Sequence, residues 1–73
     1  MSKNEECTEK VRLLQEVQKA MGVLMSIHND EVVALLKEDF TELTRLRRKL
    51  AAARDDKASK VDAFRDHVIK HRC

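Results

Sequence analysis

The sequence predicts an all-α chain folded as an antiparallel helical hairpin with a long second helix, and its composition carries this expectation. Hydrophobic residues make up 42% and charged residues 38% of the 73 residues, a balance that favours helices over disorder. The chain has no proline, one glycine and two aromatic residues, whereas strands draw on aromatic residues and on Gly or Pro turns. We expect a single helical domain over residues 1–73. Its core is marginal at this size, so assembly is expected to add stability.

The first helix is predicted over about residues 4–27. Ser2 and Glu5 have the spacing of a capping box. Projected at ~100° per residue, the apolar side chains share an arc of about 160° and the polar ones lie opposite. The arc holds Leu13, Leu14, Val17, Ala20, Met21, Leu24, Met25 and Ile27. Gly22 lies near the border of the polar face, so we interpret it as a weak point in the helix, not as a close-contact glycine.

The segment His28–Asp30 predicts the chain reversal, with the turn at about residues 28–29. Asn29 or Asp30 can cap a new helix, and Asp30 and Glu31 make its first turn acidic, as the helix dipole favours. The second helix is therefore expected over about residues 30–54. Its apolar arc comprises Val32, Val33, Leu35, Leu36, Phe40, Leu43, Leu46 and Leu50. A short connection between two amphipathic helices gives an antiparallel pair.

The segment beyond Leu50 allows two interpretations. In one, a loop near residues 55–58 breaks the second helix, and Ser59 with Asp62 forms a capping box that opens a third helix from about 59 to 71. In the other, the second helix continues to about residue 71. The leucines at 43, 46 and 50 are followed 18 residues later by Val61, Phe64 and Val68, and 18 residues are five α-helical turns.

The breadth of the apolar arcs indicates assembly. A two-stranded seam buries only a narrow stripe, so neither arc of about 160° can be covered by one partner helix. A broken second helix would give a monomeric three-helix bundle, whereas a continuous one would give a coiled-coil or four-helix-bundle dimer. The continuous helix would leave residues 51–73 projecting, with an apolar stripe for a partner to cover. The predicted partner-binding residues are Val61, Phe64, Val68 and Ile69.

These features favour a non-enzymatic interaction module. The sequence has no nucleophile elbow, phosphate loop or acid–base constellation, so we expect no enzyme activity and no cofactor. We predict an intracellular protein–protein interaction or oligomerisation module, such as an adaptor, whose partner is a second copy or another helical protein. The fold by itself assigns no function, and the sequence resembles no family that we recognise.

The alternative function is nucleic-acid binding through the basic segment 45–60. The stretch RLRRK begins at residue 45, and basic side chains in this pattern can contact phosphates. The net charge is only +2, and the segment has no aromatic residue to stack on a base. The candidate contacts, to nucleic acid or to an acidic protein, are Arg45, Arg48, Lys49, Arg54 and Lys60.

His67 and His71 are weak candidates for a metal site. Residues four apart lie on one helical face, and two imidazoles so placed can bind zinc, with Cys73 nearby. No third ligand accompanies them at a recognised spacing, so solvated histidines near a helix C-terminus are the plainer interpretation and we expect no metal.

The chain is expected inside the cell, in the cytoplasm or nucleus. Its start carries acidic residues and lacks the apolar stretch of a signal peptide, and no window has the roughly 20 apolar residues of a membrane span. Cys7 and Cys73 are accordingly expected as reduced thiols, and we expect no membrane partner.

Overall fold

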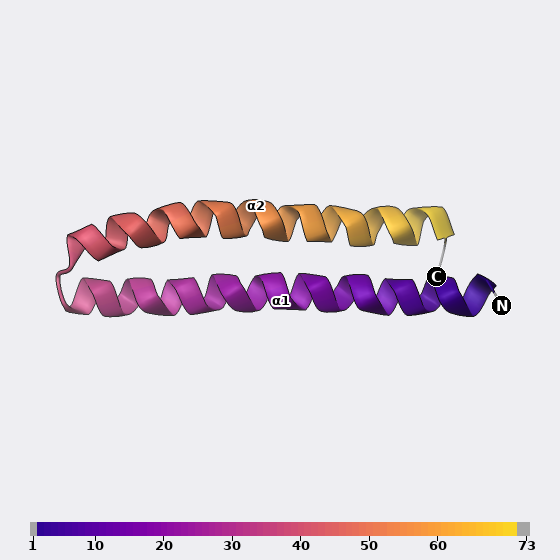
Figure 1. Cartoon of the computed structure of the whole chain (residues 1–73), viewed down its shortest axis with the longest axis horizontal. Coiled ribbons are helices and arrows are strands. Elements are labelled where there is room, and N and C mark those ends of the chain that lie inside the picture. The colour runs from indigo at the N-terminus through magenta and orange to yellow at the C-terminus, as the bar shows by residue number, and fades with distance from the viewer. Residues whose placement is uncertain (1, 72–73) are drawn as a thin grey trace.

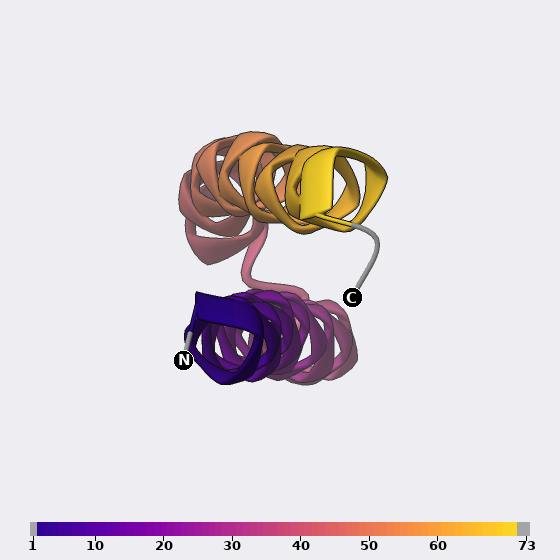
Figure 2. The ribbon, with the colours of Figure 1, turned by 90° about the vertical axis from the view of Figure 1, so that its right-hand side faces the viewer.

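The chain folds into two long antiparallel helices, which confirms the predicted all-α hairpin. The computed structural model describes residues 2–71, with side chains from Thr8 onward. Helix α1 covers Ser2–Leu36 and helix α2 covers Phe40–His71, lying side by side along their length (Figure 1). The described chain measures 55 × 14 × 11 Å, and its radius of gyration of 16.5 Å exceeds the value of about 11 Å expected for a compact domain of this length. Viewed end-on, each helix has one neighbour (Figure 2), so much of its circumference is uncovered.

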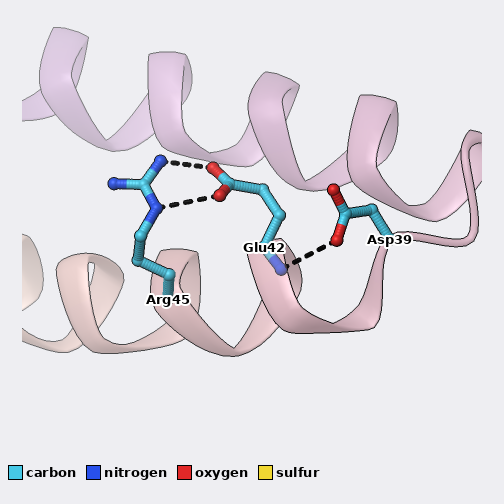
Figure 3. Close-up of polar contacts among 3 residues, drawn as sticks. All are labelled: Asp39, Glu42 and Arg45. Carbon is cyan, nitrogen blue, oxygen red and sulfur yellow. Dashed lines mark hydrogen bonds and ion pairs between the residues drawn. The ribbon is translucent and has the colours of Figure 1, made fainter.

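The turn lies at residues 37–39, and the prediction of a turn at residues 28–29 is wrong. The amide of Asp39 donates to the carbonyl of Ala34 at 2.9 Å, and that of Glu38 donates to Leu35 at 3.1 Å. These bonds form a Schellman motif, with Glu38 in the left-handed conformation at φ 55°. Asp39 then caps α2, because its Oδ1 accepts the amide of Glu42 at 3.1 Å (Figure 3).

Burial explains why the turn falls nine residues later than the cap residues at 28–30 indicate. The segment His28–Asp30 stays helical, and His28 Nδ1 lies 3.0 Å from Glu31 Oε1 within α1. Asn and Asp inside a helix cost only about 0.7 kcal/mol each relative to Ala. A late turn makes helices of 35 and 32 residues, so residues 51–71 lie beside α1 instead of projecting. The apolar surface buried in this way outweighs the local preference for a cap.

Helix α2 is continuous through residues 55–58, which confirms the interpretation of one long second helix; the alternative, a break followed by a third helix, is not found in the described chain. The segment contains no proline or glycine. Charged residues in and after this segment pair along the helix: Lys60 Nζ lies 3.7 Å from Asp56 Oδ1, and Arg65 Nη2 lies 3.3 Å from Asp62 Oδ1. Pairs at these spacings stabilise helices modestly.

The two helices meet along what we call the inner seam, a row of buried or half-buried residues spaced alternately three and four apart. On α1 the inner seam comprises Leu13, Val17, Ala20, Leu24, Ile27, Glu31 and Ala34. On α2 it comprises Leu43, Leu46, Leu50, Ala53, Lys57, Lys60, Phe64 and His67. This spacing is a heptad pattern, which keeps the row of side chains facing the neighbouring helix.

The core is concentrated near the turn. Counting residues from the turn in both directions aligns Ile27 with Leu50 and Ala34 with Leu43, and these residues belong to one packed cluster. Leu46 is its most buried member, at 1% exposed. Farther from the turn the same alignment sets Lys57 and Lys60 beside the buried Ala20 and Val17, where their half-buried aliphatic stems can cover apolar surface.

Candidate interaction surface

Helix α1 carries a second heptad row that α2 does not cover, which we call the outer stripe. Its residues are Val11, Leu14, Gln18, Met21, Met25, His28, Val32 and Leu35, again spaced alternately three and four apart. All eight are exposed, and the six apolar ones are 41–67% exposed. At 100° per residue the outer stripe is centred roughly 110° around α1 from the inner seam. A single neighbouring helix therefore cannot cover both.

The outer stripe lies in a sector of α1 without formal charge. The stripe contains no Asp, Glu, Lys or Arg, and the positions along its outward flank are Gln15, Gly22, Asn29 and Leu36. Depletion of charged residues distinguishes interface centres from the rest of a protein surface. Contiguous exposed apolar surface on a small chain likewise marks an interaction site.

The hairpin end exposes two further large apolar side chains. Leu36 is 80% exposed at the end of α1, and Phe40 is 63% exposed at the start of α2. Both flank the tight turn that Figure 3 shows. The Schellman motif and the Asp39 cap fix the backbone here, so these side chains are presented on ordered backbone.

The structure separates the four residues predicted to bind a partner. Val61, Phe64 and Val68 are half-buried on α2, and Phe64 occupies an inner-seam position. Ile69 is 65% exposed. The expectation that this stretch projects for a partner to cover is wrong for the described residues, because α1 extends alongside it. A role of the four residues in partner binding stays a prediction.

Sequence reasoning missed the outer stripe because one broad arc merged two rows. The arc of about 160° on the first helix contained Leu14, Met21 and Met25 together with inner-seam residues. Sorting its members by strict heptad spacing would have separated the two rows. Extending α1 to Leu36 would have added Val32 and Leu35, which the predicted turn assigns to the second helix.

The predicted basic contacts do not form one open surface. The Arg45 guanidinium donates twice to the Glu42 carboxylate, through Nε to Oε2 at 2.8 Å and through Nη2 to Oε1 (Figure 3). These hydrogen bonds lower the pKa of Glu42 and raise the pKa of Arg45. Lys60 lies in the inner seam near Asp56. The other three bases, Arg48, Lys49 and Arg54, are exposed, and the charge of Lys49 helps to lower the pKa of Glu42.

The histidine pair lies near the open end of the hairpin. The ring centroids of His67 and His71 are 4.5 Å apart and tilted by 42°. Among the described residues no group of three or more His, Cys, Asp or Glu side chains is arranged to hold a metal ion. Cys73 and the side chain of Cys7 lie outside the described part of the chain.

Comparison with other proteins assigns no family. The sequence matches no protein-family model, and neither a curated protein nor a solved structure is significantly similar to it. Over residues 2–71, no helix has a stretch long and apolar enough to cross a membrane. The outer stripe is therefore the feature of the described chain from which a function can be argued.

Proposed function

We propose that this chain is a non-enzymatic, intracellular interaction or oligomerisation module that binds another helix through the outer stripe of α1. The observation that carries the proposal is the outer stripe itself: a charge-free heptad row, exposed along α1, on a helix whose inner seam already packs on α2. A partner that fits it is an amphipathic helix with a matching apolar row and few charges at its centre.

Met25 is the outer-stripe residue whose substitution tests this surface most directly. At 67% exposed it is the most exposed member of the outer stripe. Burying that part of its side chain would contribute about 1–2 kcal/mol to binding, and a carboxylate left unpaired in an apolar contact costs a further ~1–3 kcal/mol or more. Met25→Glu should therefore weaken association at least about 30-fold. Ile69 is the matched position on the competing surface, since it is 65% exposed, lies on the other helix and belongs to the residues that the sequence predicts to bind a partner.

Photo-crosslinking in the cells that make the protein tests the surface whatever the identity of the partner. A photoreactive residue is placed in turn at Met25, at Ile69 and at Asp55, which is exposed and lies opposite the inner seam of α2. Discrete protein adducts at position 25 that are absent at position 55 are expected. No adducts at 25, adducts equal at 25 and 55, or adducts confined to 69 would overturn the proposal.

Nucleic-acid binding through Arg45, Arg48, Lys49, Arg54 and Lys60 is the competing function. It has less support, because Glu42 and Asp56 already accompany two of these bases. Duplex binding at low salt that is abolished by Arg48→Glu with Lys49→Glu, and that survives Met25→Glu, would favour it over the interaction module.

A further inference from the structure

We infer that the occupant of the outer stripe is a second copy of this chain, whose α1 packs antiparallel on the first α1 about the level of residue 23. This inference rests on the proposed function of the outer stripe and adds the identity, direction and register of the partner. It makes α1 the central helix of the assembly, with each α2 on the outside.

The pattern of the outer stripe is self-complementary when one copy is reversed. In an antiparallel seam, each residue at one heptad position packs beside the alternate heptad position of the other helix. Reversal about residue 23 sets Val11 beside Leu35, Leu14 beside Val32, and Met21 beside Met25 of the second copy. The two polar members, Gln18 and His28, then fall in the same layer. Apolar residues meet apolar residues in all the other layers.

The hydrogen bond of His28 suits this polar layer. His28 Nδ1 lies 3.0 Å from Glu31 Oε1, and a carboxylate oxygen can only accept, so Nδ1 carries the hydrogen. When the ring carries only this one hydrogen, Nε2 is an acceptor, and the amide of Gln18 from the second copy can donate to it. A parallel dimer would instead set His28 beside His28, with two acceptors facing one another.

The charge pattern favours α1 over α2 as the surface that the second copy covers. The inner seam of α2 is flanked by the exposed Arg47 and Arg54, and α2 has no second apolar row among the described residues. The outer stripe of α1 carries no Asp, Glu, Lys or Arg for about 36 Å of helix, taking 1.5 Å per residue. A second copy supplies a surface of the same length and the same lack of charge.

Disulfide trapping tests direction and register together. In a chain with Cys7→Ser and Cys73→Ser, single variants Leu14→Cys and Val32→Cys are oxidised separately and as a mixture. The two positions lie roughly 27 Å apart along one helix, whereas a disulfide needs Cα atoms about 4.4–6.8 Å apart. Covalent dimers in the mixture, and none from either variant alone, are the expected result. Covalent dimers from each variant alone would show a parallel dimer and overturn the inference. The variant Asp55→Cys is the control that measures crosslinking by random collision.

A charge exchange provides the second test, read by sedimentation equilibrium of the full chain. Wild type is expected at twice the monomer mass of 8.5 kDa. Met25→Glu should raise the dissociation constant of the dimer at least 100-fold, because both copies carry the change. Ile69→Glu should change that constant less than threefold. Adding Met21→Lys to Met25→Glu should recover at least tenfold, because each lysine then faces a glutamate of the second copy. In a parallel dimer like charges would meet, so no recovery would overturn the inference.

The two proposals fail in different ways. A purified chain that stays monomeric at all concentrations, together with adducts of another mass at position 25 in cells, would refute the second copy and leave the interaction surface standing. A monomer without adducts at position 25 would refute both.

Discussion

Replacing Glu38 with glycine should stabilise the hairpin, because Glu38 holds a left-handed backbone conformation at φ 55°. That conformation costs an L-residue about 1–2 kcal/mol, whereas glycine adopts it without strain. Glycine also gives the unfolded chain more freedom, which offsets about 0.5–1 kcal/mol of the gain. The net effect of Glu38→Gly should be a free energy of unfolding higher by about 0.5–1 kcal/mol. For a chain of this size, that raises Tm by about 3–6 °C.

Thermal unfolding followed by circular dichroism at 222 nm measures this difference, at one fixed chain concentration so that assembly contributes equally. Glu38→Ala is the matched control, since it removes the carboxylate and keeps the Cβ that makes the conformation costly. Lys37→Gly, one residue earlier, should lower Tm because Lys37 does not need a positive φ. A lower Tm for Glu38→Gly, or an equal rise in Tm for Glu38→Ala, would show that the positive φ of Glu38 does not destabilise the hairpin.

Three further outcomes follow from the structure. Leu46→Ala should lower the free energy of unfolding by about 2–5 kcal/mol in urea titration, since Leu46 is the most buried side chain described, and a loss below about 1 kcal/mol would contradict its place in the core. Gly22→Ala should raise that free energy by about 0.5–1 kcal/mol, because an added Cβ meets no atom within 4 Å; a decrease would indicate an unrecognised contact. The bonded Arg45 lowers the pKa of Glu42, so this carboxylate stabilises the fold above its unfolded pKa and loses that effect as pH falls through its lower folded pKa. Wild type should therefore exceed Glu42→Gln in Tm at pH 7, and the difference should vanish on acidification; a difference unchanged in acid would contradict this role.

The position of the turn shows that capping residues alone do not determine where a helix ends. The segment His28–Asp30 contains residue types that often cap helices. The observed start of the second helix also carries a capping signal, since Asp39 and Glu42 stand three residues apart. The sequence thus offers two capping signals nine residues apart. Only the paired helices decide between them, because the late turn aligns Ile27 with Leu50 and brings the whole of α2 beside α1.

The sequence indicated that the first helix has more apolar surface than one partner can cover, but it did not indicate which residues stay exposed. The width of the apolar arc on the first helix showed that one partner could not cover it, and the exposed Met25 and Leu14 agree with that reasoning. The residues left for a partner were expected at Val61, Phe64 and Val68, which the paired α1 half-covers. The position of the second helix decides which residues of a broad apolar arc pack within the chain and which stay exposed. That position is a property of the tertiary structure.

The sequence by itself determined the helices and their pairing, because helix-compatible composition and heptad spacing are properties of short windows along the chain. The sequence was also compatible with a continuous α2, since no residue between 50 and 61 forces a break. The tertiary structure alone decided the turn, the register and the exposed row. These depend on which residues meet across α1 and α2, and burial there outweighs local preferences of under about 1 kcal/mol.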